Sequence, residues 1–488
     1  MHELRRQWHT RLIIRRSADD KLARDRWRPA LIALGAFLIA FLAQRQIVLA
    51  YGVDMPFWDE WEDFPTIHAS YRAGNLTLGQ IFAPHNEHRI MTSRLITLAL
   101  FAIRGEWSPV VGMLLSAVVV GCIAATWAYT LSRLGGPVWL AWISALLLAS
   151  PIQFQNITCS FQICFYLLML CVVTGVSAIV LAPAVTWRLV LVAIVAASLA
   201  TFSLANGLLA WVALGICLLL KVKLAAPSEP VFAKGRGLRA KALGFLAIMI
   251  FQCVFYLQGL QIGASLATPV EKVFQMARWS MMALSYPFVD DFDQPIFLSV
   301  CSPLFLWIPL VLAARACMQY SHDERSNNTL VLIIGLMMFM ILSSCMIGLG
   351  RADFSIRDGS RYTTIFVWNS LLVLFALVTL WRELAGKSVH QLWQKRLLLA
   401  SLFVVLLCVH AVRAMEGLRQ ISLHAIERRQ EEQTIITYLS DPSPNRQLNG
   451  PIPYPRKDML KLRLDEPALT AILPPVLRRG KANTVPSH

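Results

Sequence analysis

Long apolar runs separated by polar loops dominate the pattern of the chain. Each run approaches the ~20 residues that an α-helix needs to cross the hydrocarbon core of a bilayer. The pattern therefore predicts an all-α fold, a polytopic transmembrane helical bundle of about eleven spans. The expected spans are 29–50, 109–131, 138–150, 161–182, 187–204, 208–220, 242–260, 296–316, 329–349, 362–380 and 397–412.

The composition supports the same class of protein. Apolar residues make up 56% of the 488 residues and charged residues 15%, with a mean hydropathy of +0.56. Soluble domains average about 25% charged residues, so this chain has too little polar surface to coat a soluble protein. The net charge of +16 does not indicate nucleic-acid binding, because zinc-finger spacing, a basic helix and interleaved basic and aromatic residues are all missing. We expect no nucleic-acid partner.

The charge of the loops predicts their sides of the membrane. Lys and Arg concentrate in cytoplasmic loops. If the basic N-terminus 1–28 is cytoplasmic, basic loops such as 221–241 fall on the same side, and the first polar loop 51–108 lies outside. An odd number of spans then places the C-terminal tail outside as well, where we expect it to pack over the polar loops. The predicted parts are the N-terminus 1–28, the transmembrane domain 29–412 and the extramembrane tail 413–488.

The first outer loop begins with a dense acidic cluster, Asp59, Glu60, Glu62 and Asp63. On a helix, Asp59 would face the carboxylates three and four positions later. Carboxylates that share one face repel each other, so near a membrane at least one pKa should rise. Such a group suits a general base or a metal ligand. The alternative is a solvated acidic loop that caps the first span.

A second polar cluster follows Pro84 and contains His85, His88 and Arg89. The two histidines would share one face of a helix, and with a carboxylate of the acidic cluster they would complete a metal site. Phosphate contact by the histidines and Arg89 is the better interpretation. We therefore expect no cofactor, with a divalent metal as the weaker option. The remaining alternative is a polar helix start.

A third cluster, in the loop between the ninth and tenth spans, holds Arg351, Arg357, Arg361 and Tyr362. Positive charge on the outer face opposes the usual bias of loop charges. A phosphate ester at the membrane surface would account for it, because the planar guanidinium binds phosphate through two parallel hydrogen bonds. The alternative is that neighbouring aspartates pair with these arginines.

Two short segments of the first outer loop resemble the GT-C superfamily of membrane glycosyltransferases. In that superfamily the first span leads directly into a large outer loop with an acidic pair, as 56–60 (PFWDE) does here. The segment 70–76 (SYRAGNL) is similar to the helix end and turn of the protein O-mannosyltransferase and aminoarabinose-transferase branches. The segment 85–90 lies where those branches carry their next polar motif, but it does not match the Pro-rich motif of the aminoarabinose branch.

The resemblance implies a donor sugar carried on a polyprenyl phosphate. The acceptor would be a glycan, lipid or protein at the outer face of a bacterial inner membrane, in contact with membrane lipid. Asp59 would be the catalytic carboxylate, with Glu60 beside it. Positive groups would stabilise the leaving lipid phosphate, and the candidates are His85, His88, Arg89, Arg351, Arg357 and Arg361, with Tyr362.

Two other classes share this architecture. An O-antigen polymerase or ligase also has many spans and outer arginines, but it would tolerate the loss of Asp59. A transporter or flippase would place charged residues near the middle of the membrane. The predicted spans are nearly free of charge, which favours chemistry at the membrane surface.

Overall fold

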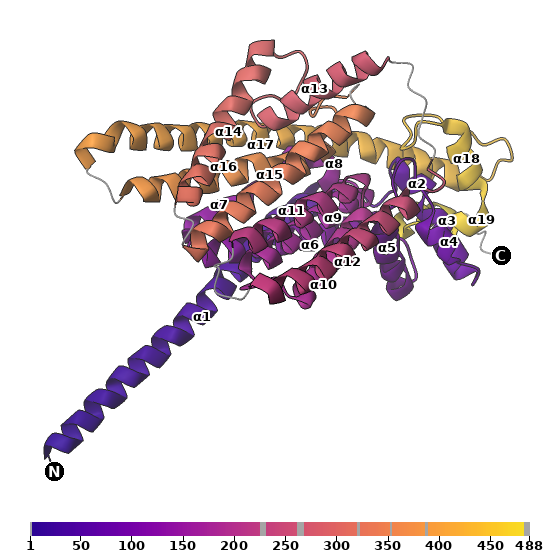
Figure 1. Ribbon diagram of the computed structural model, residues 1–488. Coiled ribbons are helices and arrows are strands. Elements are labelled where there is room, and N and C mark those ends of the chain that lie inside the picture. The colour runs from indigo at the N-terminus through magenta and orange to yellow at the C-terminus, as the bar shows by residue number, and fades with distance from the viewer. Residues whose placement is uncertain are drawn as a thin grey trace.

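The computed structural model describes residues 2–224, 231–260, 268–319, 323–351, 354–385 and 389–482. Within these ranges the chain forms α-helices and short 3-10 helices. Strand-like pairing there is limited to one isolated bridge, between His85 and His88. The all-α prediction is therefore confirmed for the described residues (Figure 1).

Ten helical segments of the described chain are long and apolar enough to cross a membrane, so this is a multi-pass membrane protein. The remaining predicted span corresponds to α10 (Trp187–Thr201), which is apolar but only 15 residues long. The ten segments belong to α1 (His2–Tyr51), α6 (Pro109–Arg133), α7 (Val138–Leu148) with η1 (Pro151–Gln153) and α8 (Phe154–Ile157), η2 (Ser160–Gln162) with α9 (Ile163–Leu181), η3 (Ala205–Gly207) with α11 (Leu208–Leu224), α12 (Val231–Leu257), α14 (Ile296–Gln319), α15 (Glu324–Arg351), η4 (Ser360–Tyr362) with α16 (Thr363–Ala385), and α17 (Val389–Ser440).

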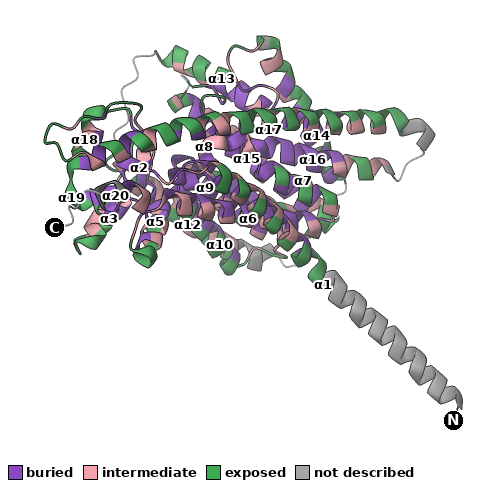
Figure 2. Ribbon diagram, turned by 180° about the vertical axis from the view of Figure 1, so that it is seen from behind, coloured by how far each residue is buried: buried purple, intermediate pink, exposed green. Residues whose placement is uncertain are grey.

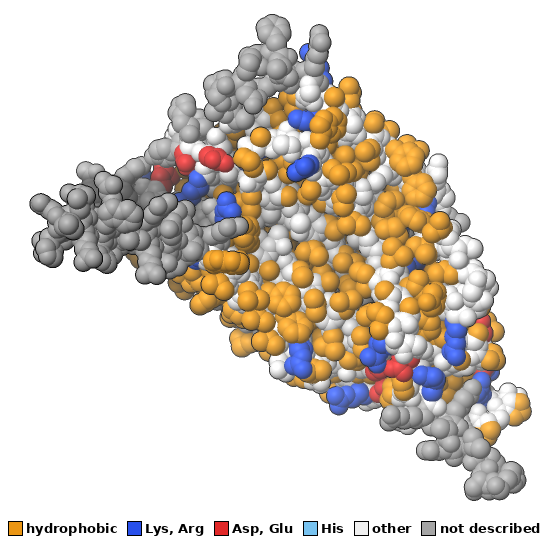
Figure 3. Space-filling model, turned by 90° about the horizontal axis from the view of Figure 1, so that it is seen from below, with side chains coloured by type: hydrophobic (Ala, Val, Ile, Leu, Met, Phe, Trp, Pro, Cys, Tyr) orange, Lys and Arg blue, Asp and Glu red, His pale blue; other side chains and the backbone are white. Residues whose placement is uncertain are grey.

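The helices differ in how much of their surface the bundle covers (Figure 2). In the span of α16, 89% of the residues are buried, whereas in the span of α12 only 11% are. No other helix of the described chain covers the outer side of α12, and Figure 3 shows a broad apolar face with charged side chains towards its ends. Exposed side chains on α12 include Leu243, Leu246, Ile250, Phe251 and Val254.

The first polar loop folds into four short helices at one end of the bundle. The tail lies at the same end, opposite the N-terminus (Figure 1). α17 runs without a break to Ser440, so the expected boundary at 412/413 falls inside a helix. The loop contains α2 (Asp59–Glu62), α3 (Phe64–Arg72), α4 (Leu78–Phe82) and α5 (Met91–Arg104), and the tail contains α18 (Lys457–Asp465), α19 (Pro467–Thr470) and α20 (Pro475–Ala482). α13 (Pro269–Ser285) packs against α15.

α5 packs into the protein because its arginine has a buried partner. Arg94, which interrupts the apolar run of this helix, is only 3% exposed and donates from Nε to Asp63 Oδ2 at 2.9 Å. Its Nη1 donates to the carbonyl oxygens of Gln80 and Ile81 at 3.1 and 3.0 Å. This ion pair ties α3, α4 and α5 into one unit.

His68 fills the apolar space between α3 and α5. Its ring stacks on Phe101, with centroids 4.6 Å apart and planes within 5°, and it also contacts Phe64 and Trp107. Neither ring nitrogen has a hydrogen-bond partner in the described chain. Burial lowers the pKa of His68 to about 4, so the ring is neutral in the folded protein at neutral pH.

His68 should make the stability of the protein depend on pH. An unfolded histidine binds a proton near pH 6.5, whereas folded His68 does so only near pH 4. Above pH 6.5 the ring is neutral in both the folded and the unfolded protein, so its burial carries no protonation penalty. As the pH drops from 6.5 towards 4, only the unfolded state binds the proton, and the free energy of unfolding falls by up to roughly 3 kcal/mol. We expect His68→Phe to reduce the loss of melting temperature between pH 7 and pH 4.5 in detergent. An unchanged pH dependence in this variant would contradict the assignment.

Candidate functional site

A cavity of about 110 Å³ lies where the first polar loop meets α9, η3, α15 and η4. Charged and polar groups of the first polar loop line one side of the cavity, and Arg351 and Arg361 line the opposite side. Apolar residues of α9 and α15 complete the wall. Six of the nine predicted site residues line this cavity, namely Asp59, His85, His88, Arg351, Arg361 and Tyr362.

Asp59 is presented to the cavity by an unusual backbone turn. The preceding residue, Trp58, has φ 46° and ψ −115°. A bulky residue in such a conformation costs about 1–3 kcal/mol and persists only where its surroundings hold it. The Trp58 side chain is half exposed, so its burial does not compensate. The Trp58 amide donates to the Pro453 carbonyl oxygen at 2.9 Å, so the tail holds this turn.

Glu60 points away from the cavity. Its fully buried carboxylate accepts hydrogen bonds from the amides of Phe57 and Phe161, at 2.8 and 3.1 Å, and from the Ser160 hydroxyl. Burial raises the pKa of Glu60, although these hydrogen bonds act against the rise. Glu60 thus joins α2 to the start of the α9 span. Its catalytic role stays a prediction, which no contact with the cavity supports.

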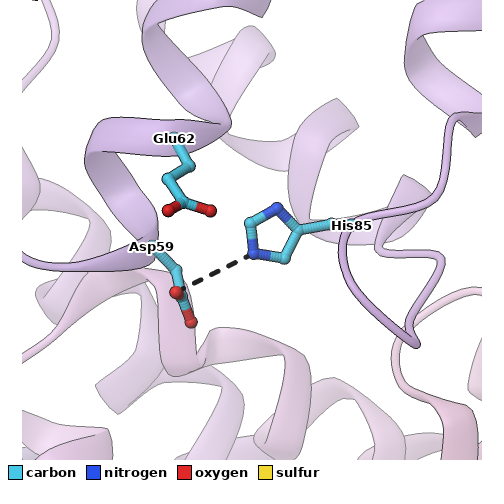
Figure 4. Close-up of side chains that lie close together, drawn as sticks. All are labelled: Asp59, Glu62 and His85. Carbon is cyan, nitrogen blue, oxygen red and sulfur yellow. Dashed lines mark ion pairs between the residues drawn. The ribbon is translucent and has the colours of Figure 1, made fainter. Parts of the chain in front are cut away.

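Asp59, Glu62 and His85 lie close together (Figure 4), and two of them, Asp59 and His85, also line the cavity. Asp59 Oδ1 is 4.0 Å from His85 Nε2, and one possible ligand atom of each residue lies within 4.8 Å of the others. Two carboxylates and an imidazole at this spacing could hold a divalent cation. Desolvation raises the pKa of Asp59, while the nearby His85 opposes the rise. The same carboxylate is therefore suited to accept a proton.

His85 and His88 lie on a tight turn, so the prediction that they share one face of a helix is wrong. The His85 amide donates to the His88 carbonyl oxygen at 2.7 Å, and the reverse bond measures 2.9 Å. Between them Asn86 has φ 50°, a left-handed conformation that Asn tolerates. These two reciprocal bonds form a tight turn in place of a helical turn. The next helix, α5, begins only at Met91.

Arg351 and Arg361 bring positive charge to the cavity from α15 and η4. Arg351 pairs with Glu87 on the histidine turn. Desolvation favours the neutral form of Glu87, but His88 and Arg351 together lower its pKa below the usual value. The Arg361 guanidinium lies 5.3 Å from the centre of the Tyr362 ring. The far wall of the cavity therefore offers donors to an anion.

The backbone of Arg361 is held by the loop between α7 and α9. Its amide donates to Gln155 Oε1 at 3.3 Å, and its carbonyl oxygen accepts from Asn156 Nδ2 at 2.8 Å. Asn156 is fully buried, so the sequon 156–158 (NIT) is not a surface glycosylation site.

Arg89 and Arg357 lie outside the cavity. Arg89 is 6% exposed and donates to the carbonyl oxygen of Tyr256 at 3.0 Å. Arg357 pairs with Asp290 and Asp291 at 3.1 and 2.9 Å, so pairing with aspartates explains this arginine, although the partners come from a different loop. Both arginines stabilise loops around the cavity.

The sequence pattern missed several residues of the cavity wall. Asn206, on the short 3-10 helix η3 between α10 and α11, was not among the predicted site residues. Gln162 and Phe161, at the start of the α9 span, were not singled out. The sequence does hold one signal that could have identified wall residues. It is a polar residue at the end of an otherwise apolar span, on the expected outer side of the membrane.

Comparison of the chain with protein-family models, curated proteins and solved structures finds no match. The chemistry of the cavity is therefore the basis for assigning a function. A carboxylate with a raised pKa faces two arginines, and an apolar wall lies beside them. This arrangement suits removal of a proton next to an anion that carries an apolar chain.

The two neighbouring acids should respond differently to substitution. Replacing Glu60 by Ala leaves the buried Phe161 amide, the buried Ser160 hydroxyl and the partly buried Phe57 amide without their acceptor, at about 1–3 kcal/mol for each unsatisfied buried group. Asp59→Ala removes no such bond, so we expect a much smaller loss of stability. Thermal unfolding in detergent measures both. A larger loss for Asp59→Ala than for Glu60→Ala would contradict these roles.

Proposed function

We propose that the protein is a membrane glycosyltransferase that moves a sugar from a polyprenyl-phosphate donor to an envelope glycan, lipid or protein. The reaction takes place at the outer face of a bacterial inner membrane. The observation that carries this proposal is the cavity in which Asp59 faces Arg351 and Arg361 at one end of a membrane bundle. The resemblance of the first outer loop to the GT-C superfamily points to the same chemistry.

In this reaction Asp59 acts as the general base. It takes the proton of the acceptor hydroxyl while the acceptor oxygen bonds to the anomeric carbon of the sugar. The bond between that carbon and the phosphate oxygen breaks, and polyprenyl phosphate leaves with the electron pair. Arg351 and Arg361 stabilise the negative charge of the leaving phosphate. A single displacement of this kind inverts the anomeric centre and requires one base.

The apolar wall of the cavity suits the lipid part of the donor. Phe165 on α9 and Met346 and Ile347 on α15 lie in the same wall as Arg351. Both helices belong to candidate membrane spans. A phosphate bound at the arginines would therefore have its polyprenyl chain directed along these helices into the bilayer.

The two alternative classes differ in what they require of the cavity. An O-antigen polymerase or ligase would use the same arginines without needing Asp59. A transporter would need charged groups along a path through the middle of the membrane, whereas the charged residues of this cavity gather at one end of the bundle. The presence of Asp59 in the cavity favours the transferase.

The contacts of the tail support an odd number of spans. The Trp107 amide donates to the Ile472 carbonyl oxygen at 3.2 Å, a contact that supports placing the tail and the first polar loop on the same side of the membrane. In this topology α1 separates the loop from the N-terminus. With ten long segments in the described part of the chain, the topology requires that α10 crosses as well. Its 15 residues extend roughly 22 Å, and we infer that the segment 202–204 completes the crossing to the cavity.

This topology can be measured on the full-length chain. A green fluorescent protein at the N-terminus should fluoresce, because it folds in the cytoplasm. An alkaline phosphatase at the C-terminus should be active, because it folds only in the periplasm. Two fusions that both report the cytoplasm would contradict the odd number of spans.

Replacing the base should abolish transfer without unfolding the protein. We expect Asp59→Asn to lower transfer by about 100-fold or more, because general-base catalysis contributes at least that factor. Mass spectrometry of surface glycans, compared between a deletion strain and strains that carry each variant, measures the loss. Asp458→Asn, the same change at an exposed acid of α18, serves as the matched control and should restore the parental glycans.

Normal glycans in the Asp59→Asn strain, with protein level and membrane insertion intact, would remove Asp59 from the mechanism. If Arg351→Ala and Arg361→Ala abolished modification in that case, the polymerase or ligase class would be favoured instead.

A further inference from the structure

Three buried polar atoms of the cavity wall have no hydrogen-bond partner in the described chain. They are Asn206 Nδ2, His85 Nε2 and His88 Nδ1. The residues Asn206 and His85 are only 5% and 7% exposed. A buried polar atom without a partner costs about 1–3 kcal/mol. Three such atoms around one cavity therefore mark a place where a polar ligand would be stabilised.

These three residues differ chemically from the arginines of the same cavity. A guanidinium only donates hydrogen bonds, which suits a phosphate. An amide side chain both donates and accepts, and so does a neutral imidazole. A hydroxyl group also donates and accepts, so Asn206 and His88 are complementary to hydroxyls.

The position of Asn206 is set by a tight turn. The Gly207 amide donates to the Leu204 carbonyl oxygen at 2.8 Å. A Cβ at Gly207 would lie 1.9 Å from the Ala200 carbonyl oxygen, so only glycine fits there. Asn206 is thereby held in η3, directly before α11.

The histidine side of the cavity is connected to this turn. The Thr92 amide at the start of α5 donates to the Phe202 carbonyl oxygen at 3.1 Å, and the Thr92 and Ser203 hydroxyls lie 2.8 Å apart. Two reciprocal backbone bonds hold His85 and His88 in their own turn. Hydrogen bonds within the protein therefore hold both polar walls in place without a ligand.

We propose that Asn206, together with His85 and His88, forms a subsite for the hydroxyls of a neutral sugar, while Arg351 and Arg361 bind the phosphate attached to it. This inference rests on the proposed function and adds the class of sugar and a residue that selects it. An amino sugar fits less well, because an ammonium group only donates and would leave Asn206 Nδ2 unpaired. Asn206 is thus the specificity residue of the donor site.

The test measures lipid binding by the purified full-length protein in lipid nanodiscs. The two probes are polyprenyl phosphate that carries one neutral hexose and polyprenyl phosphate alone, and native mass spectrometry gives both dissociation constants. We expect Asn206→Ala to weaken binding of the hexose-linked lipid about tenfold, the effect of one hydrogen bond, and to leave the bare lipid unchanged. Arg361→Ala should weaken both.

A second variant distinguishes the loss of a hydrogen bond from misfolding of the turn. Asn206→Asp keeps the shape of the side chain but replaces the Nδ2 donor by a carboxylate oxygen. We expect it to weaken binding of the hexose-linked lipid as well, and to improve binding of a lipid that carries an amino sugar in place of the hexose. Melting temperatures of both variants show whether the turn is intact.

The possible failures are distinguishable. Equal weakening of both probes by the Asn206 variants would show contact with phosphate, and unchanged binding of both would show no contact. Either result would overturn the subsite while leaving the proposed function in place. A wild-type protein that binds neither lipid would overturn the proposed function and the subsite together.

Discussion

The cavity depends on how the backbone around Asp59 is held. Trp58 adopts a left-handed conformation that a tryptophan rarely occupies, and its amide is bonded to Pro453 of the tail. The Tyr454 hydroxyl donates to Glu62, and Arg463 donates to the carbonyl oxygen of Trp61, 402 positions away in the sequence. On the inner side Glu60 is fixed to the start of α9. Asp59 alone among these residues is left facing the cavity.

One loop sets the spacing between the Asp59 carboxylate and Arg361. Ser160 and Phe161 at its end hold Glu60, next to Asp59, while Gln155 and Asn156 in its middle hold the backbone of Arg361. A base and a phosphate-binding cation act together only if their separation is maintained. The loop provides this through hydrogen bonds that are buried or partly buried, where water competes less.

The sequence pattern was informative where periodicity and charge decide the outcome. Apolar run lengths predicted the helices, and charge clusters predicted six of the residues that line the cavity. The sequence pattern failed to place side chains whose bonding partners come from distant segments of the chain. Arg89 and Arg357 look like neighbours of the site in sequence, yet Tyr256 and Asp290 bind them elsewhere. Glu60 follows Asp59, but successive residues of a helix differ by 100° in direction, so adjacent carboxylates cannot both face one cavity. The tail was expected to pack over the polar loops, and it does contact the first of them, but no local pattern shows that Pro453 in particular meets Trp58.

The most direct measurement is an electron cryomicroscopy structure of the protein in lipid nanodiscs with a non-hydrolysable polyprenyl-phosphate sugar. We expect density for the phosphate between Arg351 and Arg361, with the sugar between Asp59 and Asn206 and the lipid chain along α9 and α15. Lipid phosphate bound elsewhere, with the cavity unchanged, would contradict the assignment of this cavity as the donor site.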